Sequence, residues 1–276
     1  MFLSLHYEMN RMNEYKIAST QNPRVKAVVA LQQKSAERKR TGLFVVEGRR
    51  EVKHCVEAGF EVDWVYVCEE ADENDDEISA SVGMEHVVEV TRGVYEKMAY
   101  RGGTENVLAV VKERKLRLAD LKLRKDALVV VVERVEKPGN LGAILRSADA
   151  AGVDAVLVCD ALTDLYNPNL IRSSVGAVFT VPCVVCGSEE CIKFLKERGV
   201  KILTAQLQDS ELYYDTDMKG ATAIVMGTEA TGLTDVWRRV ADAHIRIPML
   251  GKEDSLNVSV SAAVLMYEAV RQRCGK

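Results

Sequence analysis

Three short segments carry glycine beside asparagine, serine or glutamate, and each follows an apolar run of the sequence. They span residues 133–142, 227–233 and 248–257. Glycines between a strand and a helix allow positive φ and a close approach of the backbone to a ligand. Parallel sheets bind ligands beyond the carboxyl ends of their strands. We therefore expect these three segments to form one pocket from distant parts of the chain.

The first segment leads into a helix with one conspicuous cation. Asn140 is placed to cap a helix that begins at Leu141. Apolar residues recur at helical spacing along this helix, at Leu141, Ile144, Leu145, Ala148 and Ala151. Arg146 points away from this stripe, so it faces solvent, a partner subunit or a ligand. A solvated surface arginine is the ordinary alternative.

The other two segments offer polar side chains and a site for a flat heterocycle. Glu229 can orient a hydroxyl or pair with a cation, or it can simply begin a helix, where the dipole favours it. Ser255 and Asn257 can cap the last helix. The backbone near Ile247, Met249 and Leu256 can hold an adenine by amide hydrogen bonds and apolar contact.

These residues disfavour hydrolase chemistry. The four histidines lie at positions 6, 54, 86 and 244, outside the glycine-rich segments, and no nucleophile–histidine set is apparent. Group transfer without a covalent enzyme intermediate is the class of reaction that these residues still allow. A nicotinamide-dependent oxidoreductase is an alternative, because Asp160 lies 21 residues after Gly139 and mimics a ribose-binding acid. The third glycine of that fingerprint is absent.

The seven cysteines are odd in number and irregularly spaced, which indicates reduced thiols. Cys183 and Cys186 form one CxxC pair, with Cys191 nearby. Zinc needs a fourth ligand, and no second pair follows. We therefore expect core cysteines and no metal. No apolar run reaches the roughly 18 residues that span a bilayer, and we expect a cytoplasmic protein.

The net charge of −4 gives no global signal for nucleic acid, but its distribution does. Residues 11–50 hold ten Lys/Arg against three Glu, whereas residues 69–77 form an acidic run that reads as an exposed loop. The basic stretch predicts phosphate contacts, with a solvated helix face as the alternative. Its candidate RNA-binding residues are Lys34, Arg38, Lys39, Arg40, Arg49 and Arg50.

The elements that position these residues divide into two α/β units. In the first, we expect helices at 22–33 and 50–58 and strands at 42–48, 62–68, 86–90 and 106–111. Residues 112–126 hold seven Lys/Arg without Gly or Pro and are taken as a boundary, helical in part. In the second, we expect strands at 127–132, 155–158, 178–185, 201–205, 223–226 and 244–247, and a last helix at 258–271. Apolar strands alternating with helices predict a parallel sheet covered on both faces.

Taken together, the segments resemble the SpoU (TrmH-type) family of RNA 2′-O-ribose methyltransferases in the SPOUT superfamily. The resemblance rests on Glu136–Ala148, on Ile224–Leu233, and on Ile247–Met249 followed by Ser255–Ser259, in family order. The segment 167–177, which contains Arg172, is similar to a family segment beside the active site. Residues 14–112 resemble, less specifically, the family's ribosomal-protein-like substrate-binding domain.

The resemblance implies an N-terminal extension at 1–13, a substrate-binding domain at 14–112, a linker at 113–126 and a catalytic domain at 127–276. It implies a deep trefoil knot in the catalytic domain and a homodimer with its active site at the interface. Its cofactor is S-adenosylmethionine, and its partner is RNA. The cofactor-binding residues it implies are Thr204, Ala205, Gly227, Gly232, Ile247, Met249 and Leu256. Arg172 joins the RNA contacts.

The resemblance also implies that Arg146 activates the ribose hydroxyl, with Asn140, Glu229, Ser255 and Asn257 orienting the reactants. A guanidinium stays protonated in proteins, so we expect Arg146 to hydrogen-bond the incipient alkoxide or its phosphate. Large-subunit ribosomal RNA is the favoured substrate by analogy with other two-domain members, and transfer RNA is the alternative. A non-enzymatic RNA-binding protein on the same fold is the rival from another class.

Overall fold

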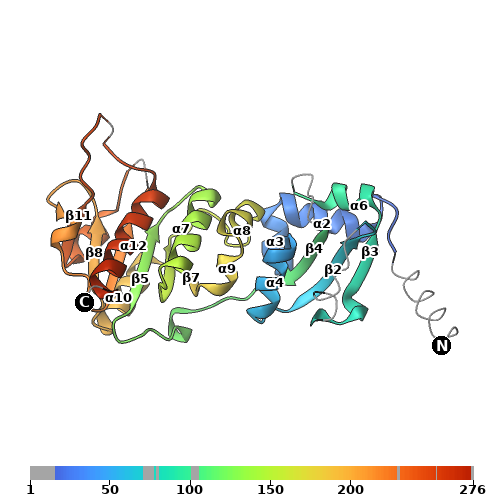
Figure 1. Ribbon diagram of the computed structural model, residues 1–276, viewed down its shortest axis with the longest axis horizontal. Coiled ribbons are helices and arrows are strands. Elements are labelled where there is room, and N and C mark those ends of the chain that lie inside the picture. The colour runs from blue at the N-terminus through green and yellow to red at the C-terminus, as the bar shows by residue number, and fades with distance from the viewer. Residues whose placement is uncertain are drawn as a thin grey trace. The chain divides into compact units, whose positions relative to one another are not determined.

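The computed structural model describes residues 16–70, 78, 81–100, 106–228, 231–252 and 254–274. The expected extension 1–13 lies outside these residues. The chain forms two compact units (Figure 1): the first runs through Arg114 and also takes in Tyr166–Arg172, and the second contains Lys115–Leu165 and Ser173 onward. No helix in the described part of the chain is long and apolar enough to cross a membrane.

The first unit is a four-stranded sheet with helices. The strands are β1 (Leu43–Glu47), β2 (Val62–Cys68), β3 (Val87–Val90) and β4 (Val107–Lys112), in the order β1-β4-β2-β3. β4 pairs antiparallel with β1 and β2, and β2 pairs parallel with β3. The helices are α2 (Pro23–Gln33), α3 (Ser35–Thr41), α4 (Arg49–Glu57) and α6 (Arg92–Met98). The strands and helices expected here are confirmed.

Local sequence explains where these helices begin and end. Asn22 caps α2, because its Oδ1 accepts a hydrogen bond from the Arg24 N–H at 2.9 Å, and Pro23 occupies the first helical position. Gly42 ends α3 at φ 67°, a left-handed conformation that glycine adopts without a steric penalty. The segment Tyr166–Arg172 is anchored here through Tyr166, whose ring stacks on Phe44 at 4.1 Å between centroids.

The second unit is built on a seven-stranded sheet of parallel strand pairs, in the order β7-β6-β5-β10-β8-β11-β9. The strands are β5 (Leu128–Glu133), β6 (Ala155–Cys159), β7 (Cys183–Cys186), β8 (Lys201–Ala205), β9 (Glu211–Leu212), β10 (Thr222–Met226) and β11 (Ala243–Arg246). The helices are α7 (Pro138–Ala150), α8 (Pro168–Ser174, shared between the two units), α9 (Ala177–Thr180), α10 (Ser188–Glu197), α11 (Asp235–Val240) and α12 (Val258–Cys274). The predicted parallel α/β architecture is confirmed.

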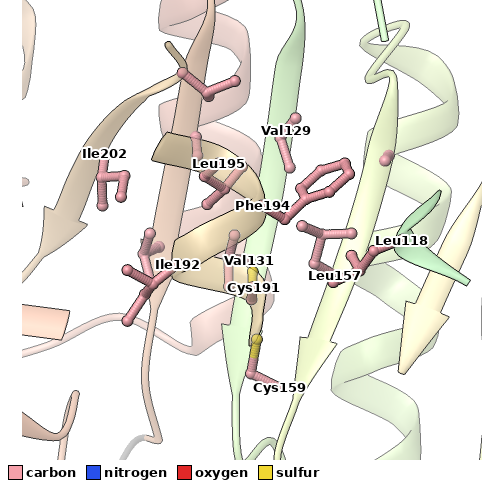
Figure 2. Packing of buried hydrophobic residues seen from close by; sticks show 14 of the residues in the cluster. Leu118, Val129, Val131, Leu157, Cys159, Cys191, Ile192, Phe194, Leu195 and Ile202 are labelled. Atoms are coloured by element: carbon pink, nitrogen blue, oxygen red, sulfur yellow. The ribbon is translucent and has the colours of Figure 1, made fainter. Parts of the chain in front are cut away.

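Both faces of this sheet are covered. Val129 and Val131 of β5 lie in one apolar cluster with Phe194 and Leu195 of α10 (Figure 2). Alternate strand residues point to opposite faces, and every residue of β5 is buried. Helices α7 and α12 pack against each other, as do α10 and α11. Burial on both faces explains why the sequences of the central strands are continuous apolar runs.

Two of the expected elements are wrong. The run 178–185 is not one strand: Ala177–Thr180 is helix α9, and β7 starts only at Cys183. Short apolar runs do not distinguish a strand from a buried helix, and Pro182 separates the two elements. The boundary segment 113–126 is also not helical beyond the single 3-10 turn Leu118–Asp120. Leu118 and Leu121 instead bury their side chains in the core of the second unit.

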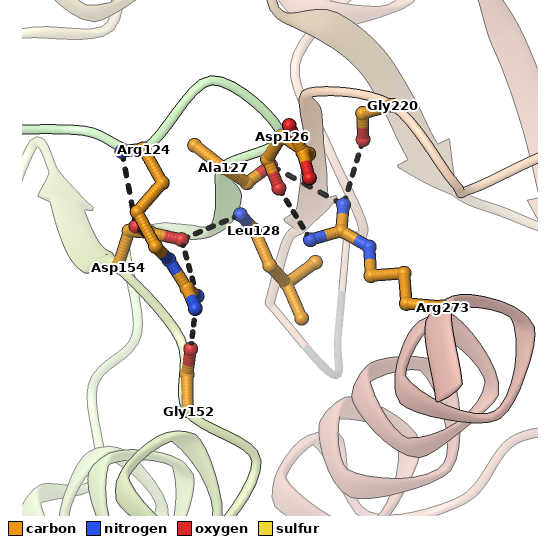
Figure 3. A network of polar contacts seen from close by, with 8 residues as sticks. All are labelled: Arg124, Asp126, Ala127, Leu128, Gly152, Asp154, Gly220 and Arg273. Carbon is orange, nitrogen blue, oxygen red and sulfur yellow. Dashed lines mark hydrogen bonds and ion pairs between the residues drawn. The ribbon is translucent and has the colours of Figure 1, made fainter.

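The amino ends of the large sheet's central strands are held by two arginines (Figure 3). Arg273, near the end of α12, donates to the carbonyl oxygens of Met218, Gly220, Asp126 and Ala127 at 2.7–3.3 Å. Figure 3 also shows Arg124 paired with the carboxylate of Asp154. The Arg124 Nε donates to Oδ1 at 2.7 Å, and Nη2 donates to Oδ2 at 2.9 Å. Side chains thus satisfy backbone and carboxylate groups that the sheet leaves unpaired at this end.

Candidate active site

A pocket of about 350 Å³ lies beyond the carboxyl ends of β8, β10 and β11. Its walls come from three loops. The lining residues in these loops are 205–208 after β8, 226–228 and 231–232 after β10, and 245–247, Met249, 254–256 and Val258 around the end of β11 and the start of α12. Two of the three segments singled out in the sequence therefore meet here. The first segment, 133–142, does not line this pocket.

The loop after β10 is closed by two glycines. Thr228 and Gly232 exchange backbone hydrogen bonds of 3.2 and 3.0 Å, and Gly232 adopts φ +66°. A Cβ on Gly227 would lie 2.2 Å from the carbonyl carbon and oxygen of Gly232. A side chain at Gly227 would therefore force the loop open, because backbone atoms cannot yield as a flexible side chain can. We call Gly227 and Gly232 the glycine clasp.

The third segment is fixed by one asparagine. Asn257 caps α12, since its Oδ1 accepts hydrogen bonds from the backbone N–H and the hydroxyl of Ser259, at 3.0 and 2.6 Å. Its Nδ2 donates to Oδ1 of Asn140 at 3.2 Å. The expected cap by Asn257 is therefore confirmed. Ser255 does not cap: its hydroxyl contacts the carboxylate of Asp254 at 3.4 Å.

Asn140 does not cap the helix that it was expected to start. α7 begins at Pro138, and its N-cap is Lys137, because proline is favoured in the first turn of a helix. Asn140 thus lies inside the first turn, and its side chain meets the amide of Asn257 instead. The first and third segments are joined by this contact across 117 residues of sequence.

Most of the predicted cofactor-binding residues share the pocket wall. Those that line it are Ala205, Gly227, Gly232, Ile247, Met249 and Leu256. Thr204 does not: it is buried, and its hydroxyl is 2.5 Å from Nδ1 of His244 on the neighbouring strand β11. Neighbouring residues of a strand face opposite sides, so Ala205 reaches the pocket and Thr204 faces away.

The pocket also contains residues that the sequence reasoning missed. Gln206 and Leu207 follow β8, and Arg238 comes from α11. Oε1 of Gln206 and Nε of Arg238 are buried without a hydrogen-bond partner among the residues that the structure describes. Buried polar atoms are nearly always paired, which suits a ligand that offers both a donor and an acceptor. The loop after β8 could have been predicted as part of the site, because it leaves the same carboxyl edge of the parallel sheet as the loops after β10 and β11.

Of the predicted catalytic residues that the structure describes, Ser255 lines this pocket, whereas Arg146, Asn140 and Asn257 do not. Arg146 is exposed on α7, opposite the buried stripe of Leu141, Ile144 and Leu145, as its spacing predicts. It does not line the pocket. Glu229 lies outside the described residues.

The basic residues of the first unit do not all face solvent. Arg38 is buried, and its Nη1 donates to the carbonyl oxygens of Leu31 and Gln32 at 2.5 and 3.4 Å, so it closes the end of α2 and is not a free phosphate contact. Arg40 pairs with Glu37. The other expected contacts are exposed or half-buried: Lys34, Lys39, Arg49, Arg50 and Arg172.

The acid that mimics a dinucleotide site is already engaged. The carboxylate of Asp160 accepts a hydrogen bond from the Ser188 hydroxyl at 2.6 Å. Ser188 in turn contacts Glu133, whose carboxylate holds the backbone N–H and the hydroxyl of Thr234 at 2.8 and 2.6 Å. Asp160 thus takes part in a hydrogen-bond network at the carboxyl ends of β5 and β6. The hypothesis of a nicotinamide-dependent oxidoreductase therefore loses its main support.

Comparison with known proteins agrees with this geometry. Residues 127–267 match the SpoU rRNA Methylase family, and residues 22–109 match the MRM3-like substrate binding domain. The chain belongs to the SpoU rRNA methylase family.

Some relatives of this SpoU-family chain match it over nearly its whole length. It is 32% identical to a 23S rRNA (uridine(2479)-2′-O)-methyltransferase of Streptomyces viridochromogenes, over 92% of each chain. It is 29% identical to the 23S rRNA (guanosine(2553)-2′-O)-methyltransferase RlmP of Bacillus subtilis, over 91% of this chain and 98% of that one. An AdoMet-bound rRNA methyltransferase from Sinorhizobium meliloti superposes with a TM-score of 0.86 at 28% identity, covering 95% of this chain and 98% of that one.

Proposed function

We propose that this SpoU-family protein transfers a methyl group from S-adenosylmethionine to a ribose 2′-hydroxyl of large-subunit ribosomal RNA. The pocket closed by the glycine clasp carries the proposal, because its loops match the family and its position suits a nucleoside ligand. Relatives of similar identity modify a uridine and a guanosine, so the target nucleotide is not proposed. The cytoplasm, where ribosomes assemble, is the proposed site of action.

The pocket residues fit the cofactor. Ile247, Met249 and Leu256 offer apolar surface for the adenine, and Gln206 and Arg238 offer the unpaired acceptor and donor that polar groups of the cofactor need. When bound, S-adenosylmethionine supplies an electrophilic methyl group on a positively charged sulfur. The loops of the trefoil knot that we infer for the family would be those that carry these residues.

Arg146 is the proposed group that acts on the ribose. Its guanidinium remains charged, so it donates hydrogen bonds to the incipient alkoxide or to the adjacent phosphate and orients the hydroxyl. Asn140 and Asn257, joined by their hydrogen bond, and Ser255 and Glu229 are proposed to position the reactants. The hydroxyl proton leaves by a route that does not use Arg146 as a base.

A homodimer would bring Arg146 to the pocket that it does not line in its own chain. Helix α12, which packs against α7, exposes Val260 and Tyr267 at 48% and 50%. These residues are seven positions apart and share one helical face. Exposed apolar surface on α12, the helix that packs against the helix carrying Arg146, supports a second copy of this chain as the partner.

The decisive experiment is methyl transfer to total RNA from a strain that lacks the protein. We expect labelled methyl in large-subunit ribosomal RNA, on ribose by nuclease mapping, and no label in RNA from the parent strain, where the site is already modified. Label in transfer RNA would contradict the proposal that large-subunit ribosomal RNA is the substrate. Cofactor binding without any transfer, even to immature ribosomal particles, would favour a non-enzymatic RNA-binding protein.

Shared active sites are testable by complementation. At a concentration of S-adenosylmethionine well below the dissociation constant of Gly227→Ala, each of Arg146→Ala and Gly227→Ala should have little activity alone. Dimers formed from equal amounts of both should recover about a quarter of the activity, since half of them are mixed and hold one intact site of two. Sedimentation should report a dimer throughout. Dimers that form mixed pairs but stay inactive would refute sharing of the site.

The exposed cations of the first unit are the proposed RNA contacts. Replacing Lys34, Lys39 and Arg50 together by glutamine should lower the slope of log affinity against log salt by roughly two to three, since each lost phosphate contact contributes about 0.7–0.9. Lys193→Gln, at an exposed site in the second unit, is the control. An unchanged slope in the triple variant would remove this surface from the proposal.

A further inference from the structure

Three cysteine sulfurs gather at the carboxyl ends of β6 and β7, on the side of the large sheet away from β8 and β11. Cys159 ends β6 and Cys186 ends β7, and the two residues are register partners in neighbouring parallel strands. Cys191 reaches them from the first turns of α10. The three Sγ atoms all lie within 4.8 Å of one another, with Cys159 and Cys186 at 3.9 Å. Figure 2 shows the sulfurs of Cys159 and Cys191 facing each other.

This spacing matches thiolates around a metal ion. A zinc–sulfur bond of about 2.3 Å at tetrahedral angles places two sulfurs roughly 3.8 Å apart. A disulfide needs a sulfur–sulfur distance of about 2.05 Å. The distance of 3.9 Å between Cys159 and Cys186 therefore suits shared coordination.

The surroundings favour thiolate ligands with one side open. Cys159 and Cys191 are fully buried in the apolar core, whereas Cys186 is half-buried and offers a route of entry. The amino end of α10, a helix of ten residues, carries partial positive charge toward this end of the sheet.

The loop that supports these ligands is itself fixed. Asp160, next to Cys159, donates its backbone N–H to the carbonyl oxygen of Cys186 at 3.0 Å. Its carboxylate accepts from Ser188 at 2.6 Å, at the first position of α10. The backbones that present all three sulfurs are thus tied together, as supporting hydrogen bonds do around metal sites.

We propose that Cys159, Cys186 and Cys191 bind one zinc ion, with a solvent molecule in the fourth position. Among the described residues, no further histidine, cysteine or carboxylate joins the group. The ion would tie the edge strand β7 and helix α10 to the interior of the sheet, so its role is structural. The CxxC pair in the sequence suggests Cys183 as a ligand, but Cys183 is not part of the group.

Cobalt binding to the full-length protein tests this site. The protein is reduced with a phosphine, stripped with a chelator, and titrated with Co²⁺ and then Zn²⁺. We expect one Co²⁺ per chain, with thiolate-to-cobalt charge-transfer absorption and the visible bands of tetrahedral cobalt, displaced by one Zn²⁺. Cys186→Ser should weaken zinc binding at least tenfold in competition with a chromogenic chelator. Cys183→Ser, on the same strand, should bind as the wild type does.

Several results would overturn the proposal. The absence of charge-transfer bands in the fully reduced wild-type protein would do so without any variant, as would a thiol count that shows a disulfide persisting after reduction. Equal weakening by Cys183→Ser and Cys186→Ser would also overturn it. Circular dichroism of each variant shows whether a loss of binding follows from a loss of fold.

Discussion

The carboxyl and amino ends of the strands in the large sheet differ in the residues that form them. At the carboxyl ends, backbone and small residues shape the pocket: the glycine clasp closes one loop, and Ser255, Leu256 and Asn257 are all exposed. At the amino ends, the long side chains of Arg124 and Arg273 saturate carbonyl oxygens and a buried carboxylate. The carboxyl ends form the proposed ligand pocket, whereas the arginine side chains at the amino ends hold the strand ends together.

Because they differ in this way, the two ends should respond differently to mutation. Changes at the pocket should alter binding or turnover and leave the free energy of unfolding nearly unchanged. Changes at the arginine end should lower that free energy and leave the cofactor affinity unchanged. Four substitutions test this separation.

The largest effect should come from Arg146→Ala. Loss of a hydrogen-bond donor aimed at developing negative charge lowers turnover by roughly 100- to 1,000-fold. The dissociation constant for S-adenosylmethionine should change little, because Arg146 is proposed to contact the ribose of the RNA and does not line the pocket of its own chain. Single-turnover methylation and calorimetric binding measure the two quantities.

The control for this variant is Arg239→Ala, since Arg239 is 78% exposed on α11. It should retain full activity. If Arg146→Ala methylates RNA at the wild-type rate while binding it normally, Arg146 has no catalytic role.

Gly227→Ala should weaken cofactor binding by about 3 kcal/mol, or roughly a hundredfold, because its Cβ would overlap the backbone of Gly232. Isothermal calorimetry measures the affinity. Gly251→Ala is the matched control: Gly251 lies in the loop before α12, and a Cβ there meets nothing within 4 Å. Normal affinity in Gly227→Ala would mean that the glycine clasp does not shape the binding site.

Arg273→Met should lower the free energy of unfolding by about 2–4 kcal/mol, because it removes hydrogen bonds to four carbonyl oxygens. Urea unfolding, followed by the fluorescence of buried Trp237, measures the loss. Lys193→Met, at a residue 76% exposed, should change the midpoint little. A large drop in cofactor affinity in Arg273→Met would show that the two ends are coupled.

The smallest effect should be a dependence on pH at the arginine end. Burial raises the pKa of Asp154, but hydrogen bonds from the side chain of Arg124 and from the backbone N–H groups of Leu128 and Arg124 outweigh it and lower the pKa below its ordinary value. A lowered folded-state pKa contributes stability that is present above the unfolded value of about 3.9 and is lost as the pH falls below it.

Asp154→Asn should therefore reduce the acid-induced loss of stability between about pH 5 and pH 3 relative to the wild type. Urea midpoints at each pH measure this. Asp235→Asn, at an exposed carboxylate, serves as the control. Parallel curves for Asp154→Asn and the wild type would show that Asp154 does not carry the effect.

Much of the fold followed from local pattern. The strands 62–68 and 201–205 have the predicted bounds, because alternation or continuous apolar character reports burial of one or both faces. The wrong strand prediction at 178–185 has a different cause: a short, largely apolar run fits a helix or a strand, and tertiary packing decides between them.

Local sequence was sufficient to predict the glycine clasp, the cap at Asn257 and the outward direction of Arg146, since each depends on backbone conformation or helical period within a few residues. Three other features depend on how the chain folds: the burial of Arg38, the contact between Asn140 and Asn257, and the grouping of Cys159 with Cys186 in place of Cys183. Strand register and helix packing set these contacts between residues far apart in the chain, and local periodicity does not encode them.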